Sequence, residues 1–182
     1  MSDSSLKIIP MRFHSFSDID RLHRFADHLF IEHQAACMEH NWDIALRKLE
    51  LMYELRIQNI KVENEFLLPL YKSEISEIPK GGALKYFERE HKLIAKYLKS
   101  IIHNISDIVL HELRDKINLV KLFENYKDVK DLLDHHDARE REFLFKLLDE
   151  NIDIQTKSSI LEKINNRQAV LIENFEIGHG AN

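Results

Sequence analysis

A short pattern occurs twice in this 182-residue chain, and it restricts the possible folds more than any other feature. Residues 59–70 and 136–147 each carry the sequence Glu-x-Glu-Phe-Leu, whose first glutamate is Glu63 in one copy and Glu140 in the other. Both copies lie in long stretches with apolar residues at helical spacing, and both glutamates fall on the apolar stripe. A lone carboxylate in a helix-bundle core costs several kcal/mol or is neutralised. Two at matching places predict a cation between them, and a metal ion is the simplest candidate.

Residues that break helices are scarce, with only four glycines and three prolines in the chain. The strongest breaker cluster, residues 78–82, separates two helical halves. Apolar stripes with a period of 3.6 residues and no strand-like alternation predict an all-α protein. Long helices are expected over about residues 18–38, 41–71, 83–101 and 119–150, a loop with a short helix over 103–118, and a fifth amphipathic helix over about 158–174.

Short connections between the long helices predict an up-down-up-down four-helix bundle with an additional C-terminal helix. The predicted organisation is an N-terminal arm over residues 1–16, the bundle over 17–150, and a C-terminal helix and tail over 151–182. The arm and the tail lack the long apolar stripes of the bundle helices.

Composition excludes several classes of protein. No run approaches the roughly 20 apolar residues of a membrane helix, and the N-terminus lacks the order of a secretory signal, so we expect a cytoplasmic protein without a membrane partner. A net charge of −5 argues against nucleic acid as a partner. The single cysteine, Cys37, excludes an internal disulfide framework and a cysteine-based zinc site. The oligomeric state is left open.

Ionisable side chains from three predicted helices are expected at one level of the core. His136 and Glu140 are four residues apart, so they project from the same helix face. His91 lies on the apolar stripe of the helix expected over residues 83–101. Glu63 lies on the apolar stripe of the helix expected over residues 41–71. Residues at equal distances from the turn of an antiparallel hairpin lie at the same level, and His91 meets this condition with both Glu63 and His136. We therefore predict that the four side chains converge.

The first helix offers a further histidine. His23 is level with Asn59, whereas His28 fits less well and His33 would require a turn inside the second helix. The predicted metal ligands are His23, Glu63, His91, His136 and Glu140. This mixture of imidazole and carboxylate groups suits iron, manganese or zinc. Arg56, two helical turns before Glu63, leaves open a buried ion network that contains no metal.

These residues give the chain a resemblance to the hemerythrin-like (HHE cation-binding) family, over about residues 14–150. Residues 19–23, Ile-Asp-Arg-Leu-His, are similar to the opening of bacterial hemerythrins, and Glu90-His91 is similar to the family's third-helix motif. His136-x-x-x-Glu140 is similar to the fourth-helix motif. Two positions depart from the family pattern. Asn59 stands where the second helix of the family has a histidine, and Phe87 stands where oxygen-carrying members have a further histidine.

The resemblance implies a non-haem diiron centre in which the histidines are terminal ligands and Glu63 and Glu140 are bridging carboxylates. It also implies that oxygen or nitric oxide is the small ligand, and that the protein carries or senses oxygen, responds to nitric oxide or handles iron. The departure at Asn59 leaves room for a mononuclear site. Two other hypotheses stay open. One is a metal-free interaction module in which Arg56 and Asn59 form the hydrogen bonds of the glutamates. The other is a diiron redox enzyme, which is disfavoured because the sequence reveals no separate substrate pocket.

Overall fold

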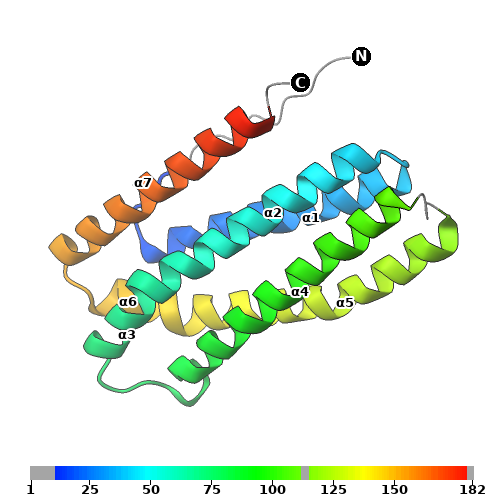
Figure 1. Cartoon of the computed structure of the whole chain (residues 1–182). Coiled ribbons are helices and arrows are strands. Elements are labelled where there is room, and N and C mark those ends of the chain that lie inside the picture. Colours follow the sequence, from blue (N-terminus) through cyan, green and yellow to red (C-terminus); the bar gives the residue numbers. More distant parts are fainter. Residues whose placement is uncertain (1–10, 112–114, 180–182) are drawn as a thin grey trace.

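The chain is built from helices joined by short turns, as the computed structural model in Figure 1 shows. The structure describes residues 11–111 and 115–179, and it describes the side chains of the last helix only as far as residue 169. The helical elements are the 3₁₀ turn η1 (Phe16–Ile19), α1 (Asp20–Met38), α2 (Trp42–Val62), the π-helical turn η2 (Glu63–Leu67), α3 (Leu68–Glu74), the 3₁₀ turn η3 (Lys80–Gly82), α4 (Leu84–Leu110), α5 (Lys116–Arg139), the π-helical turn η4 (Glu140–Phe145), α6 (Lys146–Asn151) and α7 (Ile154–His179). The described residues contain no strand, so the predicted all-α class is confirmed.

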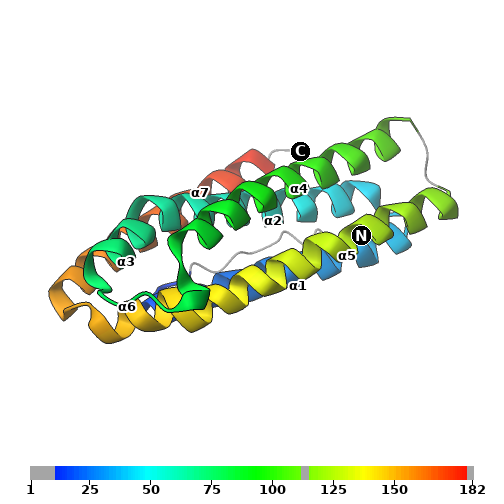
Figure 2. The same cartoon turned by 90° about the horizontal axis from the view of Figure 1, so that it is seen from below.

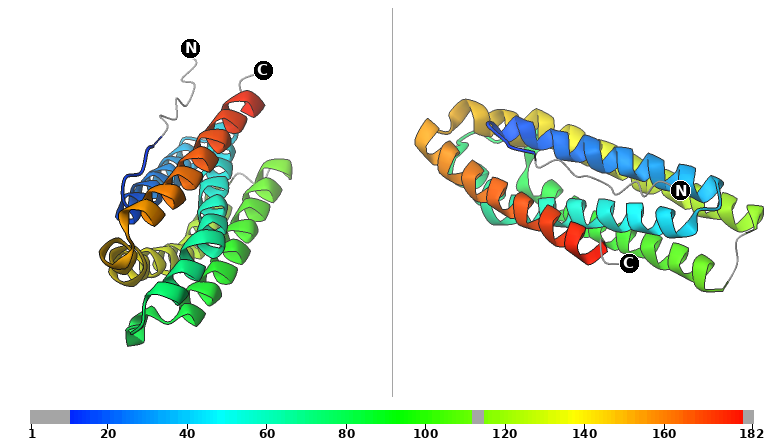
Figure 3. Two further views of the ribbon diagram at one scale, coloured as in Figure 1. Left: turned by 90° about the vertical axis from the view of Figure 1, so that its left-hand side faces the viewer. Right: turned by 90° about the horizontal axis from the view of Figure 1, so that it is seen from above.

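Four long helices enclose the core. Helix α1 packs against α2, α2 against α4, α4 against α5, and α5 against α1, so the contacts close into a ring. Figures 1 and 2 show these helices lying side by side along most of their length. Buried apolar side chains such as Leu29, Leu55, Phe87 and Leu133 fill the space between them. Helix α7 lies outside the ring along α2, as both views in Figure 3 show.

The segment between the third and fourth long helices is more helical than the sequence predicted. A loop with a short helix was expected over residues 103–118, but α4 continues to Leu110 and α5 begins at Lys116. The apolar stripe of α4 continues through Ile105 and Ile108, which are both buried and therefore favour further helical turns. The start of α5 is fixed by Asp115, whose carboxylate accepts hydrogen bonds from the backbone amides of residues 117 and 118.

Both copies of the repeated sequence pattern form π-helical turns. Turn η2 begins at Glu63 and turn η4 begins at Glu140, the two glutamates that the repeat places on the apolar stripe. The helix containing the first copy was expected to end near residues 69–71, but it continues to Glu74. Pro69 follows η2, whereas Lys146 occupies the matching place after η4, so proline is not the shared cause of the π turns. Such turns occur often at functional sites because they change which side chains face inward.

The last helix is tied to the bundle by polar contacts. Helix α7 begins four residues before its predicted start because Asp153 accepts hydrogen bonds from the backbone amides of residues 155 and 156. Leu161 and Ile164 are buried, as their stripe predicted, whereas the stripe's other predicted members lie beyond the described side chains. Arg167 donates to both oxygens of Glu65 at 2.6 and 2.7 Å.

Part of the predicted N-terminal arm, residues 1–10, lies outside the described residues. Within residues 11–16, Phe13 and Phe16 are buried, and the backbone of Phe13 is hydrogen bonded to the side chain of Asn165 in α7. Among the described residues, no helix combines the length and the apolar character that a bilayer-spanning segment needs.

One buried polar contact group joins α1, α2 and α5. His33 Nδ1 lies 2.7 Å from the carbonyl oxygen of Ala45, so this nitrogen carries the donated hydrogen. His33 Nε2 lies 2.6 Å from the hydroxyl of Tyr126 and accepts its hydrogen. Burial lowers the pKa of His33 to about 4, which keeps the imidazole neutral. Burial also raises the pKa of the neighbouring Cys37 to about 12, so this side chain is an uncharged thiol.

His33 should make folding stability sensitive to acid. The unfolded chain binds the proton near pH 6.5 and the folded chain near pH 4, so stability is lost as pH falls through this window. We expect the wild type to lose about 2 kcal/mol more than a His33→Gln variant between pH 7.5 and 5, measured by urea unfolding. The exposed His103→Gln variant should behave like the wild type. Parallel losses in the wild type and His33→Gln would refute the assignment.

Candidate metal centre

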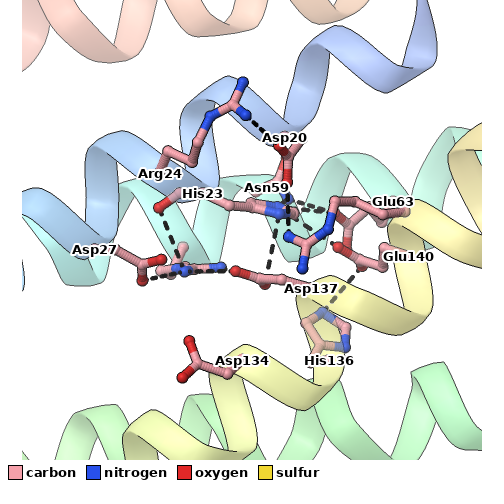
Figure 4. A network of polar contacts seen from close by, with 12 residues as sticks. Asp20, His23, Arg24, Asp27, Asn59, Glu63, Asp134, His136, Asp137 and Glu140 are labelled. Atoms are coloured by element: carbon pink, nitrogen blue, oxygen red, sulfur yellow. Dashed lines mark hydrogen bonds and ion pairs between the residues drawn. The ribbon is translucent and has the colours of Figure 1, made fainter.

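The two π turns and two of the long helices bring four predicted ligands together in the core. Glu63 comes from η2, His91 from α4, His136 from α5 and Glu140 from η4, and each is buried. One oxygen or nitrogen atom of each lies within 4.8 Å of the corresponding atoms of the others. Figure 4 shows Glu63 and Glu140 next to one another, with His136 directed at Glu140. The convergence predicted from helix levels is therefore present in the structure.

The fifth predicted ligand, His23, adjoins the same cluster. Its side chain in α1 is buried, and Nε2 lies 3.6 Å from Glu140 Oε2 and 3.8 Å from Glu63 Oε1. The alternative in the same helix, His28, is exposed and lies 3.6 Å from Glu32 on the surface. The structure thus places His23 at the centre and His28 away from it.

The two glutamates divide the centre into two halves. On one side, His91 Nε2 lies 3.0 Å from Glu63 Oε2 and 3.6 Å from Glu140 Oε1, and His136 Nε2 lies 2.9 Å from the same Glu140 oxygen. We call this side the His91–His136 half. On the other side, Glu63 Oε1 and Glu140 Oε2 face His23. Asn59 contacts Glu63 and His23 there, so we call this side the His23–Asn59 half. Each glutamate presents one oxygen to each half.

All three imidazoles have the same orientation relative to the carboxylates. Each directs Nε2 at the glutamates and places Nδ1 beside an outer acceptor. These outer contacts are His136 Nδ1 to Glu90 Oε2 at 3.1 Å, His91 Nδ1 to Asn64 Oδ1 at 2.9 Å, and His23 Nδ1 to Asp137 Oδ1 at 3.4 Å. The contacts of His136 and His91 are hydrogen bonds, whereas His23 Nδ1 makes none. An outer acceptor of this kind fixes a metal-binding imidazole and leaves its Nε2 with a free lone pair.

Several inward-facing atoms have no hydrogen-bond partner. They are His91 Nε2, Glu63 Oε2 and both carboxylate oxygens of Glu140, and all are buried. These atoms lie close to one another, but the angles between them are not those of hydrogen bonds. They therefore face a common space without forming hydrogen bonds with each other. Buried polar atoms without partners are rare and costly. A cation in the His91–His136 half would satisfy His91 Nε2, Glu63 Oε2 and Glu140 Oε1, and these residues therefore fit a metal ion.

The charges of the centre favour a cation in the His91–His136 half. Burial and the neighbouring Glu140 raise the pKa of Glu63 to about 8. Burial also acts against the charged form of Glu140, but His136 and His91 outweigh it and hold the pKa of Glu140 well below its usual range. Burial likewise disfavours charged imidazoles, yet the carboxylates raise the pKa of His91 to about 9 and of His136 to about 10. The carboxylates thus favour the protonated imidazoles in this half. A metal ion that binds here can replace those protons.

An ion pair from outside the cluster holds the carboxylate behind His136. Arg139 Nε lies 3.0 Å from Glu90 Oε1, and another nitrogen of its guanidinium donates to the carbonyl oxygen of Gly81. The guanidinium also lies 4.9 Å over the ring of Tyr86. Burial would raise the pKa of Glu90, but His136 and Arg139 lower it, so this carboxylate is ionised. Glu90 is thereby fixed as the acceptor for His136.

A second buried ion group lies beside the centre, and the sequence pointed to its arginine, Arg56, but not to its partners. Arg56 donates to both oxygens of Asp137 at 2.7 and 3.0 Å and to Asp27 at 2.8 Å. The metal-free hypothesis placed Arg56 against the glutamates of the repeat. In the structure its described ion pairs are with these aspartates instead. Asp137 could have been found from its spacing, because it lies three residues before Glu140 on the same helix face.

No family model, curated protein or solved structure matches this chain. We therefore infer its function from the geometry of the centre.

Neutralising the outer carboxylate should weaken metal binding. We expect Glu90→Gln to reduce the affinity for cobalt(II) by about 10- to 100-fold, because a neutral amide polarises His136 less. The affinity is measured by competition with a chromophoric chelator. The matched control is Glu124→Gln, at an exposed position of α5, which should leave the affinity unchanged. Equal affinities in the two variants would contradict the role given to Glu90.

Proposed function

We propose that this protein is a hemerythrin-like metal-binding protein, an up-down-up-down four-helix bundle whose core ligates a transition-metal ion. One observation carries the proposal: three buried imidazoles point Nε2 at two facing carboxylates, and outer acceptors hold the Nδ1 atoms of His91 and His136. An ordinary core histidine needs one such contact. Three rings with the same orientation around one space match the requirements of a metal site.

The ligand types favour iron, manganese or zinc. Imidazole and carboxylate together suit all three metals, and no sulfur ligand is available because Cys37 lies in the contact group of His33. The resemblance to the hemerythrin-like family favours iron among them. When bound, iron supplies a centre that can change oxidation state and take a small ligand such as oxygen or nitric oxide.

A surface pocket lies beside the centre, between α2 and α4. It has a volume of about 520 Å³ and is lined by Ile60, Asn64, Glu88, His91, Lys92 and Ala95. His91 thus lies between this pocket and the glutamates, and the pocket supports access by a diatomic ligand or by the metal itself. This function is binding or sensing of a small ligand, or handling of iron, rather than turnover of a larger substrate.

The metal-free alternative explains only part of the centre. Asn59 satisfies one oxygen of Glu63 and the Nε2 atom of His23, as that alternative requires. The inward atoms of the His91–His136 half have no such partner. Without a cation, the core would contain two buried carboxylates and two buried imidazoles with no evident role. Apolar side chains of similar size could replace these four groups with no loss of stability.

The repeat provides a matched pair of variants for testing the proposal. We expect the protein purified without chelators to contain iron, manganese or zinc, measured by inductively coupled plasma mass spectrometry. Glu140→Ala removes a ligand and should abolish metal binding, and it should also lower thermal stability, because a bound ion stabilises the folded state. Glu142→Ala, at an exposed position two residues later, should retain the metal.

Two results would contradict the proposal. One is equal metal content in the two glutamate variants. The other is a wild type that stays metal-free after anaerobic reconstitution with iron(II), which would leave the interaction module as the better account.

A further inference from the structure

We propose that the centre holds one metal ion per chain, in the His91–His136 half, and that Asn59 with the Arg56–Asp137 pair closes the His23–Asn59 half to a second ion. This inference rests on the proposed metal-binding function and specifies it further. It departs from the two-ion centre that the family resemblance implies.

The two halves offer different ligands. The His91–His136 half has two imidazole nitrogens and one oxygen from each glutamate, and neither nitrogen nor oxygen there is engaged by a neutral donor. The His23–Asn59 half has a single imidazole and the other oxygen of each glutamate. Four ligands of the right type complete a site for one ion in the first half. The second half is short of a nitrogen or oxygen ligand.

Asn59 occupies the second half with a hydrogen-bond donor. Its amide nitrogen lies 2.6 Å from His23 Nε2 and also donates to Glu63 Oε1. The amide hydrogens thus take the lone pairs of His23 and Glu63 that a second ion would need, and they leave it only Glu140 Oε2. Rotating the amide would turn its oxygen toward the carboxylate oxygen of Glu63, an acceptor facing an acceptor, so the hydrogen-bond network selects the observed orientation.

The Arg56–Asp137 pair removes the remaining candidate ligand. His23, Asp137 and Glu140 also have ligand atoms within 4.8 Å of one another, so Asp137 is the residue that could complete a second site. Both of its oxygens are instead held by the buried guanidinium of Arg56. Releasing Asp137 to a metal would leave Arg56 with only Asp27 and the backbone oxygen of His23, a costly state for a buried charge.

Charge balance leads to the same conclusion. Glu63 and Glu140 together neutralise one divalent ion. A second divalent ion would leave two positive charges that the glutamates do not compensate, and Asp137, a neighbouring carboxylate, is already paired with Arg56. Asn59 thus opposes a second ion through its hydrogen bonds, and Arg56 opposes it by keeping Asp137.

The first test is anaerobic titration of the metal-free wild type with iron(II), with bound metal measured after rapid desalting. We expect one equivalent per chain, retained in His23→Ala and lost in His136→Ala. Two equivalents in the wild type would overturn the inference and leave the metal-binding function intact. No binding would overturn both. Loss of the ion in His23→Ala with retention in His136→Ala would place it in the wrong half and also overturn the inference.

The second test opens the closed half by an isosteric change. Asn59→Asp replaces the donating amide with a ligating oxygen and adds one of the two missing negative charges, so we expect it to bind two equivalents of iron(II). Asn125→Asp makes the same change on the exposed face of α5 and should still bind one. A single equivalent in an Asn59→Asp protein with wild-type circular dichroism would overturn the role of Asn59. If that variant does not fold, the comparison of the wild type with His23→Ala and His136→Ala decides.

Discussion

The burial of two facing carboxylates, Glu63 and Glu140, is the constraint on which the rest of this structure depends. Both are completely buried, and the charge of Glu140 disfavours ionisation of Glu63. Like charges this close are tolerated in a core only when positive charge lies among them. His91 and His136 supply it through protons in the metal-free protein, and we propose that a metal ion supplies it in the functional state.

The helices are arranged to meet that constraint. Each glutamate begins a π-helical turn, and these turns come from the two copies of one sequence pattern. Neighbouring elements then hold two of the histidines from behind, His91 through Asn64 and His136 through Glu90 and Arg139. A centre whose ligands are fixed before the ion arrives loses little conformational entropy on binding it. The bundle therefore acts as a rigid frame around a polar interior.

Sequence reasoning identified the level of the centre because helical spacing and hairpin symmetry are regular. It placed His91, Glu63 and His136 together and preferred His23 to His28, as the structure has them. It missed contacts that depend on side-chain reach across helices, such as the pairing of Arg56 with Asp137. It also misjudged helix ends where a single cap decides the boundary, as at Asp115. Neither the π turns nor the orientation of the Asn59 amide has a periodic signal in the sequence.

The two halves of the centre differ in their ligands, and the proposed ion lies in the half formed by His91 and His136. That half adjoins the pocket between α2 and α4. Anomalous X-ray diffraction at the absorption edge of the bound metal, from crystals of protein purified without chelators, tests this account most directly. The account predicts one peak, about 2.0–2.2 Å from Nε2 of both histidines and adjacent to Glu63 and Glu140. The absence of any peak, or a peak beside His23 instead, would contradict it.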